Sequence, residues 1–195
     1  MAQKKTRNQS KLIMEAALAL AARHGWHRVQ LQDIAKKTKI SPKTIQADFS
    51  DIWDILIFTL RSIEKETTAD VKTRLGGSWR DNLFEILMTR FDLAQKNRKA
   101  FEKIIPSLAK YPAALPRMAR LFPETMVKML DLSGLPDTSC RPLQIIAFSG
   151  IYLSLIHAWM EDDTPDLSKT MAAIDQRLTI FDQYFISKRQ TQDNA

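Results

Sequence analysis

Residues 30–49, QLQDIAKKTKISPKTIQADF, constrain the fold of this chain more than any other stretch. Leu31, Ile34 and Ala35 recur at a spacing that places them on one face of a short helix. A Ser-Pro dipeptide follows, and these residue types favour the N-cap and the first position of a second helix. Two short helices joined by a tight turn are typical of a helix-turn-helix, whose second helix can lie in the major groove of DNA.

The net charge is concentrated in the segment that holds this motif. Residues 1–49 contain ten Lys and Arg against three Asp and Glu, whereas the remaining residues contain nineteen of each kind. The whole formal charge of +7 therefore belongs to the N-terminal quarter of the chain. A basic end on an otherwise neutral protein is the electrostatic pattern expected of a nucleic-acid-binding protein.

Apolar residues elsewhere recur three and four positions apart, and no stretch alternates with the period of a β-strand, so we predict an all-α protein. We expect residues 2–9 to form a flexible basic arm, and Pro112, Pro116 and Pro123 to break their region into short pieces. Outside the motif, the expected helices cover residues 10–24, 51–74, 78–96, 98–110, 123–133, 141–160 and 165–187.

The composition shift at the end of the motif suggests two domains. We assign residues 1–50 to a helix-turn-helix DNA-binding domain and residues 51–188 to a larger helical domain for ligand binding and dimerisation. Residues 189–195 are polar and are expected to form a loose tail.

The outward positions of the motif suit contacts to DNA. Lys43 and Thr44 can bind phosphates or base edges, Gln46 can pair with adenine, and Ala47 can touch a thymine methyl group. The basic arm can follow the backbone or enter the minor groove. The alternative is a basic surface that is merely solvated. The expected DNA-binding residues are Lys4, Lys5, Arg7, Gln30, Lys36, Lys37, Lys39, Ser41, Lys43, Thr44, Gln46 and Ala47.

The last two predicted helices carry apolar residues on more than one side, which favours a four-helix interface between two copies of the chain. A two-sided core helix within one chain is the alternative. Residues 142–160 lack charged side chains, but their polar residues favour a buried helix over a membrane span, and we expect no membrane partner. The expected interface residues are Ile145, Phe148, Gly150, Ile151, Tyr152, Leu155, Trp159, Met171, Ile174, Leu178 and Phe181.

The middle of the chain is rich in methionine and aromatic residues, which line adaptable apolar pockets but also fill ordinary cores. We expect a pocket there for a small apolar or amphipathic ligand. Its candidate lining is Met88, Phe91, Phe101, Tyr111, Met118, Phe122, Met126, Met129 and Tyr152.

The sequence offers no catalytic or metal-binding set. The three histidines are scattered, and no nucleophile–base pair or glycine-rich phosphate loop is present, so we expect neither an enzyme nor a cofactor. The acidic run Glu161–Asp163 is interpreted as a solvated loop. The single cysteine cannot form an internal disulfide, which favours a reducing, cytoplasmic setting.

Two segments, KLIMEAALALAARHGW (residues 11–26) and LQDIAKKTKISPKTI (31–45), resemble the TetR family of transcriptional regulators. Phe49 and the apolar helix after it continue the likeness, and HAWMEDDTPDLSKTMAAIDQRL (157–178) resembles the last loop and helix of the family. The resemblance implies a homodimer with nine to ten helices per chain. It also implies a repressor that binds a palindromic operator in double-stranded DNA through residues 30–49 and is released by a small ligand.

Five positions depart from the family pattern within or next to the motif. The family usually has Thr, Gly and Tyr where this chain has Gln30, Lys39 and Gln46, and a basic or aromatic residue where it has Asp48. A family lysine is often found near Ile52. These departures leave a second function open on the same fold. The accessory proteins of ubiquinone biosynthesis form a branch of the same fold, which this chain also resembles slightly. That branch binds isoprenoid lipid and membrane instead of DNA.

Overall fold

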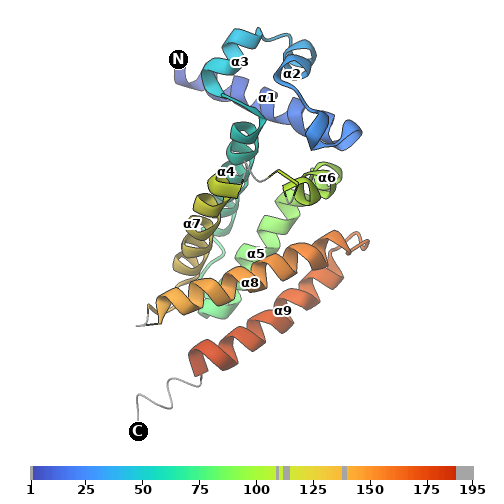
Figure 1. Ribbon diagram of the computed structural model, residues 1–195. Helices are drawn as coiled ribbons and strands as arrows, with labels where there is room; N and C mark the ends of the chain where they lie inside the picture. The colour runs from blue at the N-terminus through green and yellow to red at the C-terminus, as the bar shows by residue number, and fades with distance from the viewer. Residues whose placement is uncertain (1, 109, 112–114, 138–139, 188–195) are drawn as a thin grey trace. The chain divides into compact units, whose positions relative to one another are not determined.

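The protein is described by a computed structural model that covers residues 2–108, 110–111, 115–137 and 140–187 (Figure 1). All regular structure in these ranges is helical, which confirms the predicted all-α class and the expected number of helices. A 3₁₀ turn, η1 (Trp26–Arg28), follows the first helix, and a π-helical turn, η3 (Gln183–Ser187), follows the last. The helices are α1 (Ala2–His24), α2 (Leu31–Thr38), α3 (Pro42–Asp48), α4 (Ile52–Val71), α5 (Trp79–Gln95), α6 (Arg98–Leu108), α7 (Leu115–Ser133), α8 (Arg141–Met160) and α9 (Ser168–Asp182).

The N-terminal residues are helical, so the expectation of a flexible arm over residues 2–9 is wrong for the backbone. Helix α1 begins at Ala2 and runs without a break to His24. Its first turns contain Ala, Gln, Lys and Arg, which favour helix, and no Gly or Pro interrupts them. The side chains of residues 1–7, among them Lys4, Lys5 and Arg7, lie outside the described part of the structure.

Helix α7 also differs from the sequence expectation, because Pro116 and Pro123 lie within one helix. Pro116 falls in the first turn, where a missing N–H group costs nothing. Pro123 lies inside the helix, between turns whose apolar side chains are buried, as at Leu121 and Met126. Packing of this face holds the helix together across the proline. Pro112 lies outside the described residues.

The helices pack into two compact units, which are described separately. Unit 1 contains residues 1–65 and 93–119, and unit 2 contains residues 66–92 and 120–195. Helix α4 begins in unit 1 and ends in unit 2. The functional division at residue 50 stays a prediction, because packing and function need not divide a chain at the same residue. The tail, residues 189–195, lies outside the described residues.

Unit 1 is built around α1, whose inward face is fully buried at Ile13, Ala17 and Ala21. Helices α2 and α6 pack on this helix. The Lys103 Nζ of α6 donates to the carbonyl oxygens of Ala22 at 2.6 Å and Arg23 at 3.2 Å. A cation at the C-terminal end of α1 is favoured by the helix dipole and caps carbonyl groups that the helix leaves unpaired.

In unit 2, α8 and α9 run side by side (Figure 1). One face of α8 is buried at Phe148, Tyr152, Leu155 and Trp159. By length and composition α8 could cross a membrane. Its buried face packs on α9 within the same unit, and 28% of its apolar window is buried.

The turn between α8 and α9 depends on a buried carboxylate. Asp162 is fully buried, so the interpretation of residues 161–163 as a solvated loop is wrong at this position. One carboxylate oxygen accepts from the backbone N–H and the hydroxyl of Thr164. The other accepts from the backbone N–H and the hydroxyl of Thr170, both at 2.7 Å. Burial alone raises the pKa of Asp162, but these four hydrogen bonds outweigh it and hold that pKa well below its ordinary value.

We predict that Asp162→Asn lowers the free energy of unfolding at pH 7 by roughly 2 kcal/mol, because hydrogen bonds to a buried charge are lost. Since the pKa of Asp162 is depressed in the folded state, its stabilisation is complete above roughly pH 5 and is lost as the pH falls below about 3.9. Urea unfolding of the wild type and of Asp162→Asn at pH 7 and pH 3 measures this. The difference between their free energies of unfolding should be smaller at pH 3 than at pH 7. A difference independent of pH would contradict the assignment.

Candidate nucleic-acid interface

Helix α2 begins without a side-chain cap. Gln30 stands at the N-cap with extended backbone, and its side chain makes no capping hydrogen bond. The backbone carbonyl oxygen of Gln30 still accepts from the N–H groups of Asp33 and Ile34. Burial of Ile34 and Ala35 against the rest of unit 1 therefore stabilises this short helix more than its first turn does.

The turn after α2 adopts a backbone conformation that usually requires glycine. Lys39 has φ 58° and ψ 25°, in the left-handed region. A side chain at this position costs about 1 kcal/mol relative to glycine. The Thr38 hydroxyl donates to the Ile34 carbonyl oxygen at 2.8 Å and supports the turn. The amino group of Lys39 is carried on an exposed side chain.

Helix α3 begins with the cap expected from the sequence. The Ser41 Oγ accepts from the Thr44 backbone N–H at 3.2 Å and lies 2.7 Å from the Thr44 hydroxyl. Pro42 occupies the first turn, where its missing N–H group is harmless. The exposed side chains of α3 are Pro42, Lys43, Thr44, Gln46, Ala47 and Asp48.

Buried side chains hold α3 in place. Ile45 is fully buried, and Phe49 at the C-terminal end of α3 is 5% exposed. The Phe49 ring meets Phe58 of α4 edge to face, with centroids 5.5 Å apart. Trp26 of η1 meets Trp53 of α4 in the same manner at 6.1 Å. The helix-turn-helix is thus anchored to the first turns of α4 by aromatic contacts.

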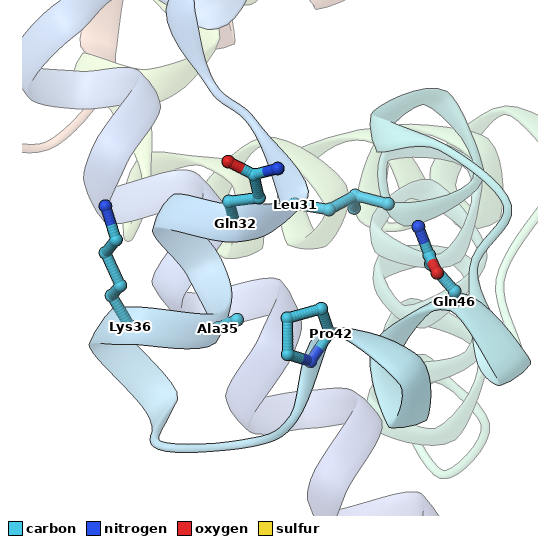
Figure 2. A pocket seen from close by; sticks show the side chains of 6 residues that line it. All are labelled: Leu31, Gln32, Ala35, Lys36, Pro42 and Gln46. Atoms are coloured by element: carbon cyan, nitrogen blue, oxygen red, sulfur yellow. The ribbon is translucent and has the colours of Figure 1, made fainter.

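An open hollow lies between α2 and α3 (Figure 2). It has a volume of about 480 Å³ and is open to solvent. Figure 2 shows the side chains of Leu31 and Gln46 pointing toward one another across it. The hollow is lined by Leu31, Gln32, Ala35, Lys36, Pro42 and Gln46.

The structure brings the predicted DNA-binding residues of the motif onto one exposed segment. Gln30, Lys36, Lys37, Lys39 and Ser41 are all exposed, as are the positions on α3 given above. Asp48 is exposed as well and brings a negative charge to the end of α3. Gln32, which is not among the DNA-binding residues expected from the sequence, also lines the hollow. Its position one residue after Leu31, on the polar side of α2, is the signal that could have identified it.

The predicted ligand-pocket residues divide between the two units. Phe101, Tyr111 and Met118 belong to unit 1, and the other six belong to unit 2. In unit 2 the Tyr152 ring lies 6.1 Å from Phe91 and 5.9 Å from Phe122 between centroids. Met88 and Phe122 are partly exposed, whereas the remaining unit 2 residues are buried: Phe91, Met126, Met129 and Tyr152.

The predicted dimer residues also fall into two groups. Gly150 and Met171 are exposed, and Ile145 and Ile151 are partly exposed. The others are buried within their own unit: Phe148, Tyr152, Leu155, Trp159, Ile174, Leu178 and Phe181. The structure instead exposes a second apolar stripe on α8, formed by Leu143, Ile146 and Leu153.

No metal site is evident, since the part of the chain that the structure describes contains no group of His, Cys, Asp and Glu that could hold an ion.

Comparison with known proteins finds a family whose sequence model matches the helix-turn-helix segment. Residues 13–56 match the sequence model of the bacterial regulatory proteins of the tetR family. This segment runs from α1 to the first turns of α4 and contains the whole exposed motif. A search of curated proteins finds no match to the chain.

Solved structures with a similar fold include TetR transcriptional regulators. One from Nitrosomonas europaea is 19% identical, with a TM-score of 0.74 over 90% of this chain and 98% of that one. Another, from Rhodococcus sp. RHA1, is 16% identical, with a TM-score of 0.64 over 93% of this chain and 99% of that one. Residues 13–56 are therefore similar to the helix-turn-helix segment of the tetR family, and the described helices have the fold seen in solved TetR transcriptional regulators.

Proposed function

We propose that this protein is a homodimeric transcriptional regulator that binds a palindromic operator and is released by a small, largely apolar ligand, most often as a repressor. The observation that carries the proposal is the exposure of α3 within the segment that holds the entire net charge. The described residues of this segment place their lysines on α2, on the turn and on α3, where a DNA backbone would pass.

The exposed face of α3 suits base reading as well as phosphate binding. Gln46 carries an amide that can pair with adenine, and Ala47 can contact a thymine methyl group. Lys43 and Thr44 at the start of α3 suit phosphate or base-edge contacts. Asp48 opposes this attraction, so we assign most of the affinity to lysines and most of the selectivity to Gln46.

A second copy of the chain fits the exposed stripe of α8. Leu143, Ile146 and Leu153 are 52%, 67% and 56% exposed, which is unusual for large apolar side chains in a row on one helix. Gly150 lies in the same stripe, and nothing stands within 4 Å of a Cβ built there. A partner helix can therefore approach the backbone closely at this point. We place the centre of the dimer interface on this stripe and not on the buried face of α8.

Regulation requires a ligand to change the spacing of the two helix-turn-helix units in the dimer. Helix α4 is continuous from Ile52 to Val71, and the contacts of Trp53 and Phe58 tie its start to the motif. A shift of α4 would move the motif with it. A ligand whose binding free energy favours the shifted conformation by a few kcal/mol is enough to release the protein from its operator.

The alternative function, lipid binding without an operator, is not favoured by the comparisons, because the similar structures are transcriptional regulators.

We predict a sequence-selective, salt-dependent complex with intergenic DNA that flanks the gene for this protein. Raising salt from 50 to 200 mM should weaken it by at least about tenfold, because bound lysines release counterions. Lys43→Ala should weaken binding to all DNA sequences alike. Gln46→Ala should instead change the difference in binding free energy between matched and scrambled DNA by roughly 1–3 kcal/mol. Fluorescence anisotropy with matched and scrambled DNA measures this, and Lys169→Ala, outside the charged segment, is the control. Equal losses on every sequence for both variants would contradict the assigned roles.

We predict that Lys39→Gly and Lys39→Ala separate the strain of the turn from its charge. Glycine relieves the left-handed backbone and should raise the free energy of unfolding by up to about 1 kcal/mol over the alanine variant. Both changes remove one cation, so both should weaken DNA binding to the same extent. Urea unfolding measures the stability of the two variants, and DNA titration measures their affinity for DNA. Alanine as stable as glycine would show that the turn is not strained.

We predict that Ile146→Glu and Gly150→Arg raise the dimer dissociation constant by about 100-fold or more. A charge, or a bulky charged side chain, on this stripe would be buried without a partner at the interface. Ile146→Ala keeps the stripe apolar and is the matched control. Light scattering over a concentration series measures the change. Dimers that persist unchanged in both charged variants would place the interface elsewhere.

A further inference from the structure

Unit 2 contains a buried cation, Arg90, that no carboxylate of the described residues neutralises. Arg90 of α5 is 6% exposed. Its Nε donates to the Tyr152 hydroxyl oxygen at 2.6 Å, and its guanidinium carbon lies 5.7 Å from the centre of the Tyr152 ring. The structure gives Arg90 no ion pair and no second hydrogen bond among the described residues. A guanidinium has five N–H donors, and the terminal nitrogens of Arg90 have no described protein acceptor. They are not among the fully buried unpaired atoms, so they reach solvent and remain open to a ligand.

The surroundings of Arg90 are apolar and aromatic. The Tyr152 ring stacks on Phe91 at 6.1 Å and meets Phe122 at 5.9 Å. Phe91 in turn lies 6.0 Å from Trp159. These rings restrict the water that can reach the guanidinium, so an anion at its solvent-reaching nitrogens would interact with it more strongly than at an open surface. The π face of Tyr152 stabilises the cation only in part.

A second unpaired polar group lies on the same face of α8. Gln144 is fully buried, and neither its side-chain oxygen nor its nitrogen has a partner. Gln144 shares the inward stripe of α8 with Phe148 and Tyr152, and it precedes Tyr152 by two turns, about 12 Å along the helix axis. Buried amides are normally hydrogen-bonded, so this one is a further sign that a ligand completes the unit.

We propose that the regulating ligand is an amphipathic anion, a carboxylate on an elongated apolar body, and that Arg90 binds its carboxylate. The inference rests on the proposed function, whose ligand it assigns to a chemical class. The terminal nitrogens of Arg90 form the fork that pairs with a carboxylate through two parallel hydrogen bonds. Tyr152 holds the guanidinium through Nε, Phe91 and Phe122 contact the apolar body, and Gln144 supplies a polar contact further along α8.

The class of ligand can be tested with probes that differ only in the head group. Decanoate is compared with 1-decanol, and 6-phenylhexanoate with 6-phenylhexan-1-ol, on the full-length protein by isothermal titration calorimetry and thermal unfolding. We expect each acid to bind at least tenfold more tightly than its alcohol and to raise the melting temperature in proportion to the logarithm of its concentration. Equal binding of acid and alcohol, or no binding of either acid at millimolar concentration, overturns the proposal.

Variants assign the preference to Arg90. Arg90→Met removes the cation and keeps an apolar stem, so the acid should lose its advantage over the alcohol. Arg120→Gln removes a charge from an exposed side chain of unit 2 and should leave the advantage intact. If Arg90→Met does not fold, Tyr152→Phe keeps the ring, removes the acceptor that holds the guanidinium, and should lower the advantage several-fold. An advantage that survives in Arg90→Met, or in Tyr152→Phe when that variant is used, overturns the assignment.

Operator binding without any acid separates this inference from the proposed function. Loss of the acid preference with intact operator binding refutes the anion site alone. An intact acid preference without operator binding refutes the proposed function alone. When both hold, saturating decanoate should weaken operator binding in the wild type and leave it unchanged in Arg90→Met.

Discussion

The exposed face of α3 depends on a small number of buried apolar side chains. Helix α3 has seven residues and is too short to be stable by itself. Ile45 and Phe49 are buried on its inner side, and Ile34 is buried on α2. These contacts fix which side of α3 meets solvent, so the positions of Lys43 and Gln46 follow from packing. The Ser41 cap and the aromatic contact with Phe58 then set where the helix begins and ends.

Local signals in the sequence predicted this part of the fold well. The Ser41–Pro42 pair marked the start of α3, and the apolar spacing of Leu31, Ile34 and Ala35 marked α2, because both depend on neighbours within a few residues. The start of α1 lies earlier than the basic composition of residues 2–9 suggests, because most of these residues, Ala, Gln, Lys and Arg, favour helix and no Gly or Pro interrupts them. At Pro123 a local breaker was outweighed by packing over the rest of α7.

Buried polar groups were beyond prediction from the sequence, because their state depends on which elements pack around them. In the sequence Asp162 is one of three consecutive acidic residues, which suggests a solvated loop. In the structure Thr164 and Thr170 donate hydrogen bonds to its carboxylate. In the sequence nothing distinguishes Arg90 from other helical arginines. Its hydrogen bond with Tyr152 depends on the packing of α8 against it. The sequence shows apolar residues on more than one side of α8, but it does not tell which side is buried. Only the structure shows that Phe148 faces inward and Ile146 faces solvent.

In the proposed function, two copies of α3 read two half-sites in DNA. Repeated selection of bound fragments from a random DNA library by the full-length protein, followed by sequencing, tests it most directly. We expect an enriched inverted repeat whose half-sites lie about one helical turn, or a multiple of it, apart. A pool that shows salt-dependent retention but no enriched motif would contradict sequence-specific reading by α3.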